Sequence, residues 1–163
     1  MPLANKSAYL PALLALVLLQ TMHAAAQAPE EPVVFGDWER SCSEGESCTF
    51  TQANADAETN DIRMRTEISM VSDTQILMSV IIPDSVLLTE GPWLTMDGIY
   101  VGELNYVRCS GGCLAQVLFT DQQFQLVSSG NRGVITVSAG GRRVGIVVSM
   151  DGLQAGLASM SDF

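Results

Sequence analysis

Two cysteines stand four positions apart around a glycine pair in the segment YVRCSGGCLAQ, residues 106–116. Along an extended strand Cys109 and Cys113 would lie about 13 Å apart, at about 3.3 Å per residue. A disulfide tolerates a Cα separation of at most about 7 Å. If the two are joined, the chain must therefore turn back between them, and the Ser-Gly-Gly sequence at 110–112 has the freedom for a three-residue hairpin loop. The spacing favours antiparallel strands on either side of this loop.

The N-terminal segment has the pattern of an export signal. Lys6 precedes an apolar run over residues 8–19, which is too short to span a bilayer comfortably. Small residues at 24–26 then provide a cleavage site. We predict a signal peptide over residues 1–26, cleaved after Ala26, and a mature protein that is periplasmic, outer-membrane-associated or secreted.

Cleavage at this point would remove Lys6 and His23, the only lysine and the only histidine. Nucleophile pairs that need a histidine or lysine base, and metal sites built on histidine, then lack an essential residue. The dinucleotide-binding and P-loop fingerprints are missing as well. We therefore expect no cofactor, no metal site and no catalytic residue.

The predicted mature chain is strongly acidic. Seven arginines face eighteen aspartates and glutamates, a net charge of −11. This balance is a poor match for nucleic acid or an anionic membrane. We expect no nucleic-acid partner and no membrane span after cleavage, while the oligomeric state stays open.

Short apolar runs separated by Gly, Asp, Asn and Ser follow a disordered lead-in over residues 27–32. They predict strands near 33–40, 47–52, 62–71, 75–82, 86–89, 93–96, 99–108, 113–120, 122–127, 133–138 and 143–150. Helical periodicity is confined to residues 150–160, where Asp151 is a candidate cap. The pattern predicts an all-β protein: one antiparallel β-sandwich domain over residues 33–163 with a short C-terminal helix.

Two of these runs carry a more specific pattern. In RMRTEISM, residues 63–70, apolar or small residues at the even positions alternate with charged or polar ones, which predicts a strand with one wet face. The run QILMSVII, residues 75–82, is apolar apart from Gln75 and Ser79. It is predicted to be a central strand covered on both faces.

Four cysteines in an exported chain favour two disulfides, with three possible connectivities. We predict the two local pairs, Cys42–Cys48 and Cys109–Cys113. Such short loops contribute about 2 kcal/mol each in the loop-entropy view, so they fix turns more than they hold the fold. A four-cysteine zinc site and a thiol oxidoreductase fit less well, because the spacings are not C-x-x-C.

Several of these segments together resemble the invasion-associated locus B family. The resemblance rests on Trp38, the Cys42 and Cys48 pair, LLTEGPWLTMDG (87–98), YVRCSGGCLAQ (106–116) and VVSMDGLQAGLASM (147–160). Its most specific element is a Tyr-x-x-Cys-x-x-x-Cys-x-Ala run, formed by Tyr106, Cys109, Cys113 and Ala115. The resemblance implies an exported all-β sandwich from Gram-negative cells, linked to host-cell entry in pathogens, with no established catalytic residues. The chain departs from the family pattern at Leu153, where an aromatic residue is expected.

One loop offers a calcium-site alternative. Asp56, Glu58, Asn60 and Glu67 fall at ligand positions of an EF-hand loop, but Asp61 takes the place that needs glycine. A solvated acidic hairpin loop is the preferred interpretation.

The remaining candidates are interpreted as structural. The methionines and tryptophans are assigned to the core, with an adaptable binding groove as the alternative for the methionines and an exposed docking role as the alternative for the tryptophans: Met64, Met70, Met78, Met96, Met150, Met160, Trp38 and Trp93. Arg142 and Arg143 could pair with an anionic partner, although a solvated turn is preferred. The only candidates for the paired catalytic carboxylates of a glycoside hydrolase are Asp97, Glu103 and Asp121.

We therefore predict a non-catalytic, exported module that binds an envelope or host protein, by strand addition at an edge or through a loop. The alternative from another class is a carboxylate-based hydrolase or binder acting on envelope glycans.

Overall fold

The computed structural model describes residues 31–43, 48–56, 62–72 and 75–159. The predicted signal peptide, its cleavage after Ala26, most of the lead-in and Met160 lie outside the described residues. Within them, no helix is both long and apolar enough to cross a membrane.

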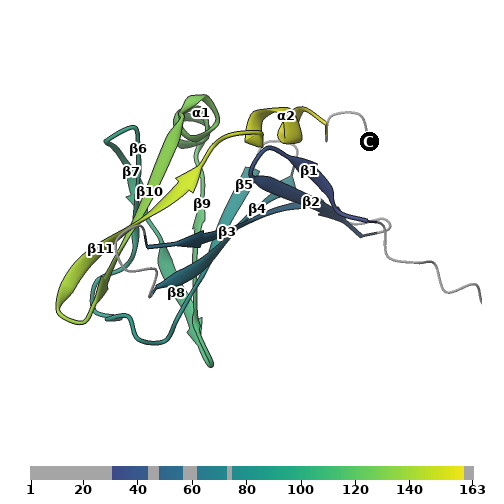
Figure 1. Ribbon diagram of the computed structural model, residues 1–163. Coiled ribbons are helices and arrows are strands. Elements are labelled where there is room, and N and C mark those ends of the chain that lie inside the picture. Colours follow the sequence, from purple (N-terminus) through teal and green to yellow (C-terminus); the bar gives the residue numbers. More distant parts are fainter. Residues whose placement is uncertain (1–30, 44–47, 57–61, 73–74, 160–163) are drawn as a thin grey trace, which may run out of the picture.

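The strands form two antiparallel sheets (Figure 1). The larger has seven strands in the order β1-β2-β3-β4-β5-β9-β8. Their bounds are β1 (Val33–Phe35), β2 (Trp38–Cys42), β3 (Cys48–Ala55), β4 (Arg63–Ser72), β5 (Gln75–Ile82), β9 (Cys113–Leu118) and β8 (Asn105–Cys109). The smaller has four, in the order β11 (Arg142–Ser149), β10 (Arg132–Ala139), β6 (Trp93–Met96) and β7 (Ile99–Glu103). The predicted all-β class with a C-terminal helix is confirmed.

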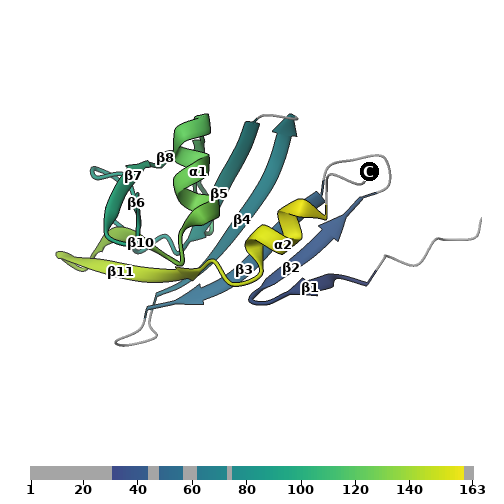
Figure 2. The same cartoon turned by 90° about the horizontal axis from the view of Figure 1, so that it is seen from above.

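The smaller sheet and two helices lie over one face of the larger sheet (Figures 1 and 2). Helix α1 (Asp121–Ser129) contacts β7, and helix α2 (Leu153–Ala158) contacts β1 and β2. The main core fills the space between these layers, and its largest fully buried side chains include Trp38, Phe50 and Ile135. In both views the opposite face of the larger sheet carries no helix or strand among the described residues.

Alternation along β4 and β5 builds the larger sheet as the sequence predicts. In β4 the even residues from Met64 face the core, and Arg63, Arg65 and Glu67 face outward. Strand β5 lies in the interior of its sheet between β4 and β9, and its side chains are buried or half-buried except at Gln75. The central position of the run 75–82 is confirmed.

Polar side chains join the two sheets where β11 passes β3. The Gln52 amide donates to the carbonyl oxygen of Ser149 at 3.1 Å and accepts its backbone N–H at 2.9 Å. The Trp38 indole N–H donates to the same carbonyl at 2.9 Å. Gln52 is 5 % exposed, so these bonds satisfy amide groups that would otherwise be costly to bury. They fix the register of β11 against the larger sheet.

Two predicted strands are each divided in the structure. The run 33–40 turns at Gly36, whose φ is +55°, and becomes β1 and β2. The run 99–108 breaks at Leu104, which is 1 % exposed and donates its N–H to the Pro92 carbonyl oxygen at 2.7 Å. The chain crosses there from β7 in one sheet to β8 in the other. The sequence pattern over 99–108 cannot reveal such a crossing, because both halves keep strand character.

Two further strand predictions are wrong. Residues 86–89 form a single bridge, Val86 to Ala139, and Leu87 donates its N–H to the Ser138 carbonyl oxygen at 2.7 Å. Residues 122–127 lie in helix α1. Its first turn is held by a capping box, in which Thr120 accepts the N–H of Gln123 at 3.3 Å and the Gln123 side chain accepts the N–H of Thr120 at 2.9 Å. This cap outweighs Phe124, Leu126 and Val127, the apolar residues that suggest a strand.

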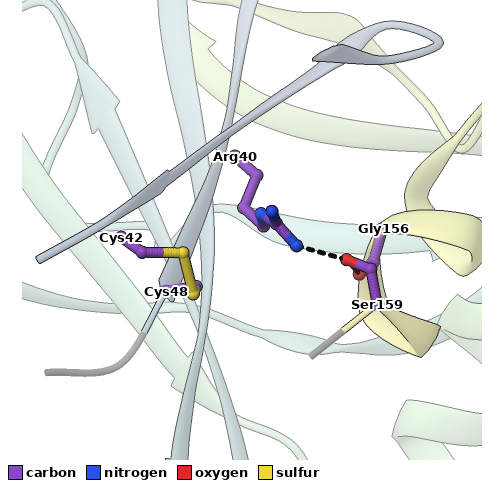
Figure 3. The surroundings of a disulfide bond; sticks show 5 residues. All are labelled: Arg40, Cys42, Cys48, Gly156 and Ser159. Atoms are coloured by element: carbon purple, nitrogen blue, oxygen red, sulfur yellow. Dashed lines mark hydrogen bonds between the residues drawn. A yellow bond between two sulfur atoms is a disulfide. The ribbon is translucent and has the colours of Figure 1, made fainter. Parts of the chain in front are cut away.

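The C-terminal helix is shorter than predicted and begins differently. Its N-cap is Gly152, not Asp151, and no side chain caps it. Arg40 reaches from β2 and donates to the Ser159 hydroxyl at 2.6 Å, beside the Cys42–Cys48 disulfide (Figure 3). Contacts with β1 and β2, including the Arg40 hydrogen bond, therefore hold helix α2 against the larger sheet.

Candidate binding surfaces

A groove of about 360 Å³ runs along the β10–β11 hairpin, at the edge strand β11 of the smaller sheet. Three arginines line it: Arg132, Arg142 and Arg143. The rest of its lining is Val134, Val144, Gly145, Val147 and Asp56. We call this feature the arginine groove. It gathers three of the seven arginines that follow residue 26.

The hairpin register places two of these arginines on the same face. Val134 pairs with Val147 and is half-buried, whereas their neighbours Ile135 and Ile146 are fully buried. Alternation therefore sends Arg132 outward with Val134, and Arg143 outward with Val147. Arg143 pairs with Ser138, six residues from Arg132 along β10. The two backbone positions are therefore about 20 Å apart along the strand, at about 3.3 Å per residue.

Trp93 lies under the arginine at one end of the groove. The Arg143 guanidinium lies over its ring, 5.3 Å from the ring centroid. Trp93 pairs with Thr136 on the outward face and is half-buried, so its assignment to the core is wrong. The reason is register, because its neighbour Leu94 takes the core position at 0 % exposure. Trp38, by contrast, is fully buried as predicted.

A missing side chain keeps the middle of the groove open and accessible. Gly145 is exposed and lies between Arg143 and Val147 on β11. A Cβ atom built there would come 3.0 Å from Val134 Cγ1, tighter than ordinary van der Waals contact. Glycine at this position thus leaves backbone and valine methyl groups as the floor.

Asp56 is the one carboxylate among the described residues lining the groove. It is 4 % exposed and forms a bridge with Ile146 on the edge of β11. Its N–H donates to the Ile62 carbonyl oxygen at 2.9 Å, which closes the β3–β4 hairpin. The calcium alternative gains no support here: Glu67 lies on the larger sheet and pairs with Arg65 at 2.8 Å, while Glu58 and Asn60 lie outside the described residues. The described residues contain no cluster of metal-ligand type.

The three carboxylates offered for hydrolysis are not gathered at one hollow. Asp97 accepts the N–H groups of Asn131 and Arg132 at 3.0 Å each, which ties the β6–β7 turn to the start of β10. Glu103 ends β7, four residues along the strand from Ile99 at that turn. Asp121 opens α1. Asp97 thus has a structural role, and none of the three carboxylates lines the arginine groove or the second hollow described below.

A second hollow of about 600 Å³ lies between the end of α1 and the start of α2. Its described lining is mostly neutral and includes Ser128, Ser129, Asn131, Asp151 and Gln154. The Ser129 hydroxyl donates to the Gln125 carbonyl oxygen at 2.6 Å, so part of this polar lining is engaged within α1. The hollow is wider than the arginine groove and lacks its concentration of like charge.

The sequence profile of the invasion-associated locus B (IalB) protein family matches residues 38–161. The chain belongs to this family. Among solved structures, the fold is similar to the crystal structure of invasion-associated protein B from Bartonella henselae, with a TM-score of 0.67 and 16 % sequence identity. The match covers 80 % of this chain and 96 % of the Bartonella chain. No curated protein matches the sequence.

The invasion-associated locus B motif around residues 106–115 forms a clamped hairpin. Cys109 and Cys113 are joined with an S–S distance of 2.08 Å and a Cα separation of 4.0 Å, across antiparallel β8 and β9. The glycines at 111 and 112 have φ values of +65° and +128°, conformations that side chains disfavour. The second disulfide, Cys42–Cys48, clamps β2 to β3 with a Cα separation of 4.1 Å.

The other family residues pack inward. Ala115 is fully buried, and Leu153, the departure from the family pattern, is 1 % exposed in the core. The buried Tyr106 hydroxyl has no hydrogen-bond partner among the described residues, and burial raises the pKa of this side chain. The methionines assigned to the core are buried or partly buried there, Met160 excepted. The family motif therefore specifies packing, and the arginine groove lies elsewhere.

Only part of the groove is visible in the sequence. Arg142 and Arg143 stand together there, and a solvated turn is the preferred interpretation of the pair. No sequence pattern singles out Arg132, although the predicted strands 133–138 and 143–150 flank a Gly-Gly turn at 140–141. Pairing those strands as a hairpin would have placed Arg132 and Arg143 on a common face.

Proposed function

We propose that this protein is a non-catalytic binding module of the bacterial envelope, and that the arginine groove is its contact surface. It is exported by a signal peptide over residues 1–26 and works in the periplasm, at the outer membrane or after secretion. In a pathogen this binding would serve host-cell entry, as the family name suggests.

The observation that carries the proposal is the gathering of positive charge on an acidic protein. The groove holds three arginines where the predicted mature chain has a net charge of −11. Like charges placed together repel one another, an effect that a ligand of opposite charge removes.

The local geometry supports recognition more than catalysis. Arg143 stacked on Trp93 presents a planar guanidinium, a group suited to binding a carboxylate or phosphate through two parallel hydrogen bonds. The described groove lining supplies one carboxylate, Asp56, which is buried at a strand junction. A glycosidase of the usual kind needs two carboxylates on either side of the scissile bond.

In-cell photocrosslinking tests this proposal. A photoreactive residue replaces Thr136, which faces outward beside Gly145, and in a matched strain it replaces Thr51 on the outward face of the larger sheet. We expect a reproducible adduct from position 136 that is lost when Arg143→Gln is added, and none from position 51. Mass spectrometry then identifies the partner. Adducts of equal yield from both positions, or none from position 136, would contradict the assignment of the groove.

A further inference from the structure

The charge of the arginine groove is concentrated at its two ends. Arg132 and Arg143 face outward about 20 Å apart along the hairpin, while the middle is formed by Val134, Val147 and the Gly145 backbone. Arg142 lies beside them on the edge strand and has another contact of its own. A ligand that fits this arrangement carries negative charge at its ends and apolar groups between them.

The apolar floor disfavours a uniformly charged ligand. Val134 and Val147 are half-buried and pair across the hairpin, so they offer methyl groups to whatever lies over them. A phosphate or sulfate placed there would lose water without gaining a donor, which costs free energy. An aliphatic side chain would instead bury apolar surface against these methyl groups. The notch above Gly145 gives such a side chain room.

The net negative charge of the protein also disfavours a long polyanionic ligand. Salt screens charges beyond about 8 Å at physiological ionic strength, so a short ligand responds chiefly to the groove itself. A long polyanion extends past the groove and meets a surface with a net charge of −11. The same groove therefore selects a short acidic segment over a polyanionic glycan, lipid surface or nucleic acid.

An extended peptide matches these dimensions. Side chains six residues apart in a strand point to the same side and lie about 20 Å apart, which equals the spacing of the two arginine positions. The residues at the second and fourth positions between them also point to that side. Aspartate or glutamate at the ends and valine or isoleucine between would thus all face the groove.

We propose that the ligand of the groove is an extended protein segment with two carboxylate side chains six residues apart and β-branched apolar side chains between them. This inference rests on the proposed function of the groove. Arg143, held by Trp93, binds one carboxylate, and Arg132 binds the other. Val134, Gly145 and Val147 accept the apolar side chains.

The test uses the mature protein and three fluorescently labelled, acetylated peptides in anisotropy titrations. DTVTVTD has the proposed pattern, NTVTVTN lacks both charges, and TTDVDTT keeps the charges two residues apart. We expect DTVTVTD to bind at least about tenfold more tightly than either of the others, and its affinity to fall as salt is raised. Equal binding of DTVTVTD and TTDVDTT would overturn the proposed spacing.

Variants link the binding to the two arginines. Arg132→Gln and Arg143→Gln should each weaken DTVTVTD binding about tenfold, whereas Arg108→Gln, an exposed arginine on β8, should leave it unchanged. Heparin serves as the polyanion probe. If it binds in an Arg143-dependent way while DTVTVTD does not, the peptide is the wrong ligand class but the groove stands. If none of these probes responds to Arg143→Gln and position 136 gives no crosslink in cells, the proposed function fails as well.

Discussion

Helix α1 begins with a capping box made by its own residues, whereas helix α2 begins at a glycine with no side-chain cap. Thr120 and Gln123 satisfy each other's backbone N–H groups at the start of α1. Helix α2 has six residues, too few to be stable alone, and depends on the strands below it. Helix α1 is therefore stabilised at its start by local interactions, whereas helix α2 depends on tertiary contacts.

Three contacts seat α2 on the larger sheet. At Gly152, with φ +83°, a Cβ atom would collide with the backbone of Phe35. At Gly156 a Cβ atom would collide with the Phe50 ring. At the end of the helix, the Ser159 hydroxyl accepts from Arg40 and donates to the Gly156 carbonyl oxygen, both at 2.6 Å. If the contrast between the helices is correct, substitutions at Gly152 and Gly156 should lower the free energy of unfolding more than a substitution at the α1 cap does.

The largest effect is expected from Gly152→Ala. The substitution combines a disfavoured positive φ with a backbone collision against β1, so we expect a loss of about 3 kcal/mol or more in the free energy of unfolding. Urea unfolding measures it. Gly98→Ala is the matched control, because Gly98 has the same φ of +83° with nothing within 4 Å of the added Cβ. Equal losses at the two positions would show that the loss comes from backbone strain alone, and that the packing of α2 against β1 does not contribute to it.

Gly156→Val should rank second. The larger side chain improves helix propensity slightly but must displace the Phe50 ring, and overpacking of this kind costs about 2 kcal/mol net. A double-mutant cycle with Phe50→Leu locates the effect, since the smaller residue makes room. The loss from Gly156→Val should shrink by at least half in that background. An unchanged loss would place the cause elsewhere than the Phe50 contact.

Thr120→Ala tests the local side of the comparison. It removes the acceptor for the Gln123 N–H, and loss of a side-chain N-cap costs about 1 kcal/mol. Hydrogen exchange should show faster opening of α1, with α2 unaffected. Thr120→Ser keeps the hydroxyl and should restore most of the protection. If Thr120→Ala opened both helices equally, the capping box would not be a local device.

The smallest effect is expected from Ser159→Ala, which removes two hydrogen bonds at a half-buried helix end. About 0.5–1 kcal/mol should be lost from the free energy of unfolding. Ser128→Ala on exposed α1, where the hydroxyl bond is 3.4 Å long, is the control and should cost less. A loss above that of Thr120→Ala would mean that the Arg40 contact, not packing at Gly152 and Gly156, dominates the seating of α2.

The same division explains which parts of the candidate site were predictable. The neighbouring Arg142 and Arg143 are visible as a charged pair in the sequence. Their partner Arg132 joins them only through hairpin register, and Trp93 only through the pairing of β6 with β10. Register fixes which face each side chain takes, and one residue of slip would send Trp93 inward. A binding surface assembled across strands is therefore hidden from a reading of single segments.

Short-range patterns in the sequence determined the all-β class, the wet and dry faces of β4, the central position of β5 and the reversal between Cys109 and Cys113. They also encode the α1 cap, although the apolar residues within 122–127 favour a strand. The tertiary structure alone decided that the chain changes sheets at Leu104, that α2 lies on β1 and β2, and that the three arginines meet. The first group depends on neighbours within a few residues, where alternation, loop length and capping act. The second depends on pairing and packing between distant segments, whose free energies no local pattern contains.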